Sequence, residues 1–284
     1  MTVGEVLRRS TKYLSDREVE TPRLDAELLV AKALGRSRLE LYIEHDRPLV
    51  EPELVVCREL VARRGRREPA AYILGEWGFR RLTLGTDSRA LVPRPETELV
   101  VERCLALLAE AVEPRVLDVG TGSGAIALAL ADELPHARVT ALDCSADALV
   151  LASENARRTG LADHVRFVEG DFREGLGDGT YDLVVSNPPY VGEDEYVGLQ
   201  AEIREWEPRG ALVGGLDESA TIAAGARTVL EGAGHLVLET APRLADPLIE
   251  TLAGLGFAGI AASRDLAGEV RVIEARMVES SPTS

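Results

Sequence analysis

The sequence is poor in residues that mark secreted, membrane-spanning or metal-binding proteins. Its 284 residues include three cysteines and four histidines, and neither set shows the spacing of a metal site. A sparse, odd number of cysteines is typical of reduced thiols in a cytoplasm. No apolar run approaches the roughly eighteen residues of a membrane span, and the N-terminus lacks the apolar region of a signal peptide. We therefore expect a cytoplasmic protein with no metal and no membrane partner.

A basic surface is also missing, because the formal net charge is −16. Nucleic-acid enzymes usually carry a basic footprint, since phosphate neutralisation supplies much of their affinity. We therefore expect no direct nucleic-acid partner. The local exception is an arginine cluster, interpreted as a solvated helix end, with a patch for an acidic partner as the alternative. The cluster consists of Arg58, Arg63, Arg64, Arg66 and Arg67.

What is present is a short motif, Asn187-Pro188-Pro189-Tyr190, after the apolar run 181–186. The run predicts a buried parallel strand. Proline offers no ladder donor, so the chain must turn out of the sheet at this point. The turn leaves a side-chain amide, carbonyls and an aromatic ring at the carboxyl end of the strand, where open α/β sheets bind ligands. Alone, the motif is equally compatible with a rigid loop.

A second motif lies upstream, where Gly120-Thr121-Gly122-Ser123-Gly124 separates a predicted strand, 116–119, from a predicted helix, 125–131. Glycines allow a tight turn and close approach of backbone N–H groups to a ligand. The pattern GxGxG differs from the GxGxxG of dinucleotide sites, and no GK[ST] follows, which excludes a P-loop.

Two further predicted strands end in acidic residues. The run 138–143 ends at Asp143, 23 residues beyond Gly120, a spacing that suits a carboxylate accepting from ribose hydroxyls. The run 165–170 is followed by Asp171-Phe172. An acid and a ring at that strand end could hold an adenine.

Together these segments resemble class I S-adenosylmethionine-dependent methyltransferases, and more closely the family that methylates a glutamine of peptide chain release factors. GxGxG occurs in many methyltransferases, and NPPY is shared with enzymes that methylate exocyclic nitrogens of bases. The PRPETE segment, at residues 93–98, is the part of the resemblance that is specific to the release factor family. The resemblance covers nearly the whole chain, and its matching segments are Leu91–Glu98, Asp118–Gly124, Ser186–Tyr190 and Glu207-Pro208-Arg209.

The resemblance, with strands and helices alternating from residue 115 onward, implies an α/β fold. We expect a Rossmann-like seven-stranded methyltransferase sheet with a small N-terminal helical domain joined by a β-hairpin linker. The expected divisions are a helical substrate-docking domain at 1–68, the linker at 69–94, the cofactor-binding catalytic domain at 95–279 and a disordered tail at 280–284.

Proline and glycine locate several helix ends. Thr21-Pro22 and Gly35 bound one predicted helix, Glu51-Pro52 and Gly65 bound another, and Pro95-Glu96 begins a third. Late strands are expected at 235–239, 257–262 and 270–275.

The resemblance implies that Asn187, Pro188, Pro189 and Tyr190 hold the substrate, with Asn187, Pro188 and Tyr190 as catalytic residues. An amide nitrogen is a poor nucleophile because its lone pair is delocalised into the carbonyl. The Asn187 side-chain oxygen and the Pro188 carbonyl would accept its hydrogens and stabilise the forming positive charge. Tyr190 would pack against the planar amide.

The implied cofactor is S-adenosylmethionine, with S-adenosylhomocysteine as product. The backbone of Gly120, Thr121, Gly122, Ser123 and Gly124 would hold its methionine part, and Asn187 would lie against it. Asp143 would accept from the ribose, with a helix cap ahead of Ser145 as the alternative. Asp171 and Phe172 would flank the adenine, with a core aromatic as the alternative for Phe172.

Four supporting residues keep two roles open. Asp118 could accept from the cofactor's ammonium through water, or it could satisfy the N–H groups of the glycine loop. Arg94, Glu96 and Thr97 would close over the cofactor or brace the NPPY loop, and they could also cap the helix that starts at Pro95.

Three positions depart from the family pattern: Phe172 replaces the usual tryptophan, and Val213-Gly214-Gly215 and Glu239-Thr240-Ala241 differ from the usual loops. The function that we expect is methylation of the glutamine in the Gly-Gly-Gln loop of release factors, and we expect the protein to act as a monomer. Two alternatives to this function stay open. One is methylation of an exocyclic amino group of a nucleic-acid base, against which the net charge and PRPETE argue. The other is an inactive cofactor-binding interaction protein, against which the intact NPPY argues.

Overall fold

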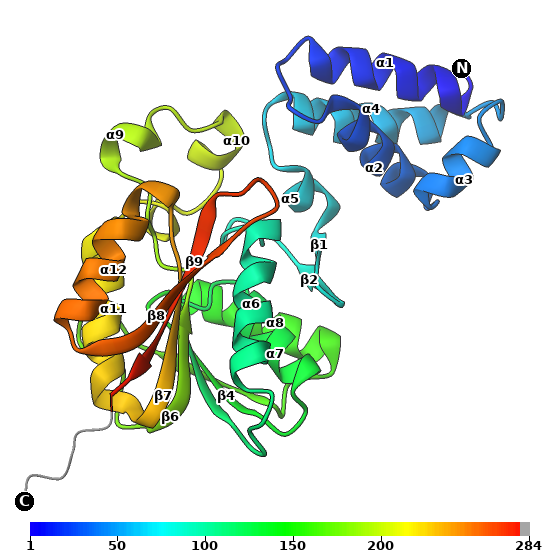
Figure 1. Ribbon diagram of the computed structural model, residues 1–284. Coiled ribbons are helices and arrows are strands. Elements are labelled where there is room, and N and C mark those ends of the chain that lie inside the picture. The colour runs from blue at the N-terminus through cyan, green and yellow to red at the C-terminus, as the bar shows by residue number, and fades with distance from the viewer. Residues whose placement is uncertain (279–284) are drawn as a thin grey trace, which may run out of the picture. The chain divides into compact units, whose positions relative to one another are not determined.

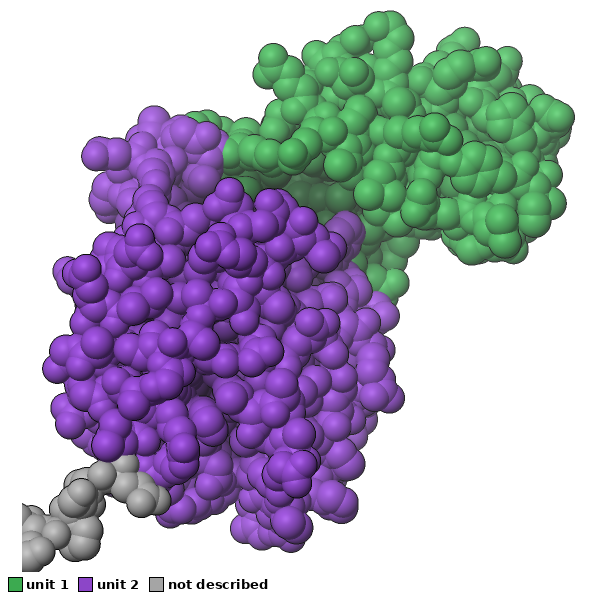
Figure 2. Space-filling view, in the orientation of Figure 1, with its two compact units in different colours: residues 1–76, 200–206 green, residues 77–199, 207–284 purple. Residues whose placement is uncertain are grey.

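The chain forms two compact units in the computed structural model, which describes residues 1–278 (Figure 2). Unit 1 comprises Met1–Glu76 and Gln200–Trp206, and unit 2 comprises Trp77–Leu199 and the chain from Glu207 onward. The tail expected at 280–284 lies outside the described residues. No helix within the described part of the chain has the length and apolarity needed to cross a bilayer.

Unit 1 is helical. Pro22 and Gly35 bound its second helix as predicted, and Gly35 has the left-handed φ of +60° that suits a helix end. Thr21 differs from the expected N-cap, since its hydroxyl donates to Asp25 Oδ1 at 2.9 Å instead of accepting from the helix. The helices are α1 (Val3–Ser15), α2 (Pro22–Leu34), α3 (Arg38–Ile43), α4 (Glu51–Gly65), α5 (Ala70–Leu74) and the distant α10 (Ala201–Arg204).

A buried ion pair network ties α10 to the other helices of unit 1. Arg64 on α4 is 5% exposed and donates to Asp25 Oδ2 at 2.6 Å and to Glu202 Oε1 at 2.7 Å. Arg67 also pairs with Glu202. The interpretation of the arginine cluster as a solvated helix end is therefore wrong for Arg64. A buried guanidinium needs carboxylate partners, and α10 brings one from far along the chain.

Unit 2 is built on the expected seven-stranded sheet, with the order β5-β4-β3-β6-β7-β9-β8. The five strands from β5 to β7 are parallel, and β9 is antiparallel to both of its neighbours. β7 begins at Leu230, ahead of the predicted start at residue 235, because Leu230 pairs with Tyr181 of β6 before a bulge shifts the register. The strands are β3 (Arg115–Val119), β4 (Arg138–Asp143), β5 (Val165–Glu169), β6 (Tyr181–Ser186), β7 (Leu230–Glu239), β8 (Phe257–Arg264) and β9 (Val270–Met277).

Helices cover both faces of this sheet (Figure 1). Alternate residues of each strand point to opposite faces. Val116 and Val185 accordingly pack in one apolar cluster with α6 and α7, while Leu117 and Val184 pack in another with α11 and α12. A parallel sheet buried on both faces requires such near-continuous apolar strands. The helices of unit 2 are α6 (Pro95–Leu107), α7 (Ala125–Glu133), α8 (Ala146–Thr159), α9 (Glu193–Tyr196), α11 (Leu216–Val229) and α12 (Ala245–Gly254).

The expected hairpin is the two-stranded sheet of β1 (Glu76–Phe79) and β2 (Leu82–Gly85), which follows α5. Asn155 on α8 connects it to the glycine loop. The Asn155 side chain accepts from Gly85 N at 2.6 Å and donates to Ser123 O at 2.9 Å. The hairpin end and the glycine loop are therefore held by one buried amide.

Candidate active site

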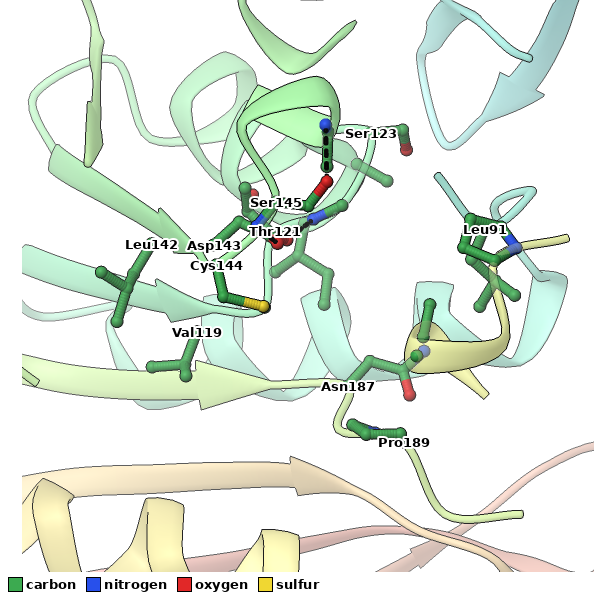
Figure 3. A pocket seen from close by; sticks show the side chains of 18 of the residues that line it. Leu91, Val119, Thr121, Ser123, Leu142, Asp143, Cys144, Ser145, Asn187 and Pro189 are labelled. Atoms are coloured by element: carbon green, nitrogen blue, oxygen red, sulfur yellow. Dashed lines mark hydrogen bonds between the residues drawn. The ribbon is translucent and has the colours of Figure 1, made fainter. Parts of the chain in front are cut away.

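A cavity of about 380 Å³ lies in unit 2 at the carboxyl ends of β3, β4 and β6 (Figure 3). Its volume is within the range of small-molecule sites, roughly 300–1,000 Å³. Its position is the one expected for ligands of open α/β sheets. The predicted site residues that line it are Arg94, Thr97, Gly120, Thr121, Gly122, Ser123, Asp143, Phe172, Asn187 and Pro189.

Six predicted residues are not among those that line the cavity: Glu96, Asp118, Gly124, Asp171, Pro188 and Tyr190. Gly124 has a packing role instead. Its φ is +83°, and a Cβ there would meet Leu128 Cδ1 at 3.1 Å and Ala152 Cβ at 3.2 Å. Glycine at this position lets the start of α7 approach α8 closely.

Asp118 braces the glycine loop. Its side chain is fully buried, and Oδ2 accepts from the Thr121 hydroxyl at 2.6 Å and from Ala127 N at 3.2 Å. These donors are a hydroxyl of the glycine loop and a backbone N–H in the first turn of α7, and neither is an N–H group of the loop itself. Burial raises the pKa of Asp118 to about 7, against the opposing effect of both hydrogen bonds.

Asp143, at the end of β4, holds the neighbouring loops through one hydrogen bond to each oxygen. Oδ2 accepts from Gly122 N at 2.8 Å, and Oδ1 accepts from Ser145 N at 2.9 Å. The cap of α8 is the Ser145 side chain, which accepts from Ala148 N. Because each carboxylate oxygen can accept more than one bond, Asp143 keeps acceptor capacity on the cavity wall.

Phe172 combines the two roles considered for it. It lines the cavity, and it also packs against the apolar cluster beneath α11 and α12. The Arg173 guanidinium lies 4.7 Å from the centre of its ring. Asp171, beside it, accepts from Arg173 N at 2.9 Å.

The NPPY motif follows β6, whose last residue, Ser186, donates to Val119 O at 2.6 Å. Asn187 lines the cavity, and its Nδ2 donates to Thr97 Oγ1 at 3.2 Å. Figure 3 shows Asn187 and Pro189 just beyond one strand end, apart from Asp143 and Ser145 beyond another. The Tyr190 hydroxyl donates to Glu239 Oε1 at 3.0 Å.

The loop after NPPY is fixed by the segment that departs from the family pattern. Val191 N donates to Leu212 O, and Gly214 N donates to Val191 O. A Cβ at Gly214 would lie 2.3 Å from the Pro189 carbonyl oxygen. The segment Val213-Gly214-Gly215 therefore keeps a glycine where the NPPY turn approaches most closely.

Sequence reasoning missed the structural roles of two buried glutamates. Glu207 is 6% exposed, and its carboxylate accepts from Arg94 at 2.5 Å and from Val92 N at 3.2 Å. Glu239 is 1% exposed, and burial raises its pKa to about 7. An acid closing the apolar run 235–239 is the same signal that marked Asp143, and it could have identified Glu239.

Within the described residues, no three His, Cys, Asp or Glu side chains gather as metal ligands.

The residues on the wall fit an adenosyl cofactor. Gly120 and Gly122 have left-handed φ values of +72° and +55°, and a Cβ at Gly120 would meet no atom within 4 Å. The glycine loop therefore presents bare backbone to the cavity. Asp143 adds an acceptor and Phe172 a ring at neighbouring strand ends.

Comparisons with known proteins agree with this geometry. Residues 5–75 match the family model described as the PrmC N-terminal domain, and residues 97–203 match the methyltransferase small domain. The chain is 43% identical over 277 residues to the release factor glutamine methyltransferase of Chlorobaculum tepidum, covering 93% of each chain. It is 41% identical over 279 residues to that of Geobacter sulfurreducens, covering 97% of each.

Solved structures share the fold. The hMettl16 catalytic domain in complex with MAT2A 3'UTR hairpin 6 superposes with a TM-score of 0.60 at 16% identity, over 76% of this chain and 83% of that chain. A methyltransferase from Pyrococcus furiosus gives a TM-score of 0.50 at 19% identity, over 69% and 89%. At these identities the likeness concerns the fold alone.

Proposed function

The chain belongs to the family of release factor glutamine methyltransferases, and on this premise we propose that Asn187 presents the reacting glutamine in the cavity of unit 2. The protein transfers a methyl group from S-adenosylmethionine to the side-chain amide nitrogen of a release factor glutamine, with S-adenosylhomocysteine as product. The glutamine is that of the Gly-Gly-Gln loop. The observation that carries the proposal is the bond from Asn187 Nδ2 to Thr97, because it leaves the Asn187 oxygen to accept from a substrate amide.

Asn187 and its neighbours supply orientation and charge stabilisation. Bound S-adenosylmethionine supplies a methyl group already activated by a sulfonium, so no metal or covalent intermediate is required. The Asn187 side-chain oxygen and the Pro188 carbonyl accept the two amide hydrogens, which orients the nitrogen and favours its pyramidal form. Both acceptors stabilise the positive charge that forms on nitrogen. After methyl transfer the methylated nitrogen is a strongly acidic protonated amide, and it loses its proton to water without a general base.

The remaining residues of the cavity hold the cofactor. The backbone of Gly120–Ser123 faces its methionine part, Asp143 accepts from the ribose hydroxyls, and Phe172 lies against the adenine, with Asp171 next to it in the chain. Gly124 supports the loop through its packing against α8. Asp143 is supported in this role by its place on the cavity wall and its remaining acceptor capacity. Arg94 and Thr97 brace the NPPY loop, with Glu207 and Asn187 as their respective partners.

The proposal extends to partners and location. The release factor docks on the N-terminal helices, no nucleic acid binds directly, and the protein acts as a monomer in the cytoplasm. The net charge of −16 supports the exclusion of nucleic acid. The sparse, odd number of three cysteines supports a reducing compartment.

Transfer of tritiated methyl groups tests the function. The purified protein is incubated with labelled S-adenosylmethionine and one of three acceptors: a release factor, its Gln→Ala loop variant, or bulk nucleic acid. We expect label on the unaltered release factor alone. Label on nucleic acid would support base methylation, and cofactor binding without any transfer would support an inactive binding protein.

A further inference from the structure

Glu239, at the end of β7, lies behind the NPPY motif. Its side chain is 1% exposed, and its Oε1 accepts from the Tyr190 hydroxyl at 3.0 Å. Burial and the nearby carboxylate raise the pKa of Tyr190, so the phenol keeps its proton and donates. One residue of the motif is thus held by this buried acid.

Thr97, on α6, connects the same acid to Asn187. Thr97 is 4% exposed, and its hydroxyl oxygen accepts from Asn187 Nδ2 at 3.2 Å. A hydroxyl that accepts such a bond still has its own proton to donate. The Thr97 hydroxyl lowers the pKa of the Glu239 carboxyl, against the larger effect of burial, as a hydroxyl does when it lies beside a carboxylate that can accept its proton.

We propose that Glu239 is a positioning residue whose carboxylate, as common acceptor for the Thr97 and Tyr190 hydroxyls, fixes the direction in which Asn187 presents its side-chain oxygen to the glutamine. This inference rests on the proposed function. The direction of these hydrogen bonds matters because an asparagine side-chain amide can rotate by half a turn, which exchanges its oxygen and its nitrogen. If the Thr97 hydroxyl donated to the Asn187 oxygen instead, the Asn187 NH₂ would face the substrate NH₂, and two donors would oppose each other.

The charges around Glu239 make this arrangement sensitive to pH. Burial raises its pKa to about 7, Glu96 on α6 acts in the same direction, and Arg271 on β9 opposes it together with the Thr97 and Tyr190 hydroxyls. Among the residues that the structure describes, none forms a hydrogen bond with Glu239 Oε2. A proton taken up by the carboxyl would turn an acceptor into a donor and remove the fixed direction.

Glu239→Gln is the first test, because it preserves shape and replaces an acceptor by a donor. We expect kcat for release factor methylation to fall by about 10- to 100-fold, by analogy with the loss of an outer-shell residue that orients a metal ligand. Affinity for S-adenosylhomocysteine and KM for the release factor should change little. Glu274→Gln is the matched control, since Glu274 lies on the adjacent β9 and pairs with Arg103, away from the cavity. It should retain wild-type kcat.

Thr97 provides the second test through a pair of variants. Thr97→Val removes the hydroxyl at constant shape, and we expect the same loss of kcat as in Glu239→Gln. Thr97→Ser restores a hydroxyl and should recover most of the rate. A purely structural role for Thr97 would not be restored by serine, because serine lacks the methyl group that packs in the interior.

The pH profile is the third readout. For wild type we expect kcat to rise as the pH increases through about 7, because Glu239 becomes a carboxylate over that interval. Glu239→Gln should lose this rise. Asp118 also has a pKa near 7, but it is present in both proteins, so the difference between the profiles belongs to Glu239.

The outcomes separate this inference from the function it rests on. A wild-type protein that does not methylate a release factor would overturn the proposed function. Active wild type with unchanged kcat in Glu239→Gln, or equal rates in Thr97→Val and wild type, would overturn the positioning role alone. A fall in kcat confined to Glu239→Gln and Thr97→Val, with serine rescue, would support it.

Discussion

The side-chain nitrogen of Asn187 donates to the Thr97 hydroxyl 3.2 Å away, although 90 residues separate them in the chain. Thr97 belongs to the PRPETE segment, and Asn187 belongs to NPPY. The two segments, distant in the sequence, are therefore joined by a side-chain hydrogen bond. The helix that begins at Pro95 holds the Asn187 side-chain nitrogen, and in the proposed mechanism this leaves the Asn187 oxygen to accept from the substrate amide.

Asp143→Ala tests the cofactor site. We expect affinity for S-adenosylhomocysteine to weaken by about 1–3 kcal/mol, the typical value of a hydrogen bond to a charged group. The melting temperature should also fall, because Gly122 N and Ser145 N lose their acceptor. Titration calorimetry and thermal unfolding measure the two effects. Cys144→Ala, on the same cavity wall, is the control that should bind normally. Undiminished affinity in Asp143→Ala would restrict Asp143 to bracing the loops.

Gly214→Ala tests the packing beneath the NPPY turn. A Cβ there would lie 2.3 Å from the Pro189 carbonyl oxygen, so one of the two backbones must shift. We expect a large loss of kcat with cofactor affinity retained. Gly215→Ala is the matched control, since a Cβ at Gly215 meets no atom within 4 Å. Equal methylation rates in the two variants would show that the turn tolerates displacement.

Asp118 should make the protein less stable as the pH rises. Its pKa is raised from 3.8 to about 7 by burial, so between these values the folded state holds a proton that the unfolded state has released. The free energy of unfolding therefore falls across this interval, by at most about 1.4 kcal/mol per pH unit from this group. Asp118→Asn should flatten the dependence in urea unfolding at pH 5, 6 and 7. A slope identical to wild type would place the Asp118 pKa elsewhere.

Arg64→Met should destabilise unit 1. The substitution leaves two carboxylates, Asp25 and Glu202, without their shared guanidinium in a buried setting. We expect a loss of about 3–5 kcal/mol in the free energy of unfolding, as found when one partner of a buried pair is removed. Arg58→Met is the matched control, because the pair of Arg58 with Glu51 is exposed and contributes about 1 kcal/mol or less. Similar denaturation midpoints for the two variants would contradict the role given to Arg64.

Local patterns were sufficient to predict the α/β sheet and the loops at its carboxyl edge. Apolar runs ended where strands end, and the residues just beyond, such as Asp143 and Asn187, lie on the cavity wall because parallel strands share that edge. The role of Arg64 could not be predicted, since its burial depends on Glu202, 138 residues away. The contacts of Glu239 depend on α6 and the NPPY motif together, and no local spacing records them.

The most direct test of the central claim is single-turnover methyl transfer by Asn187→Ala at saturating S-adenosylmethionine. The account predicts a rate at least about 100-fold below wild type, as for the loss of one preorganised stabilising group, with S-adenosylhomocysteine affinity within about twofold of wild type. Transfer at the wild-type rate would contradict it, because the Asn187 oxygen would then have no part in holding the glutamine.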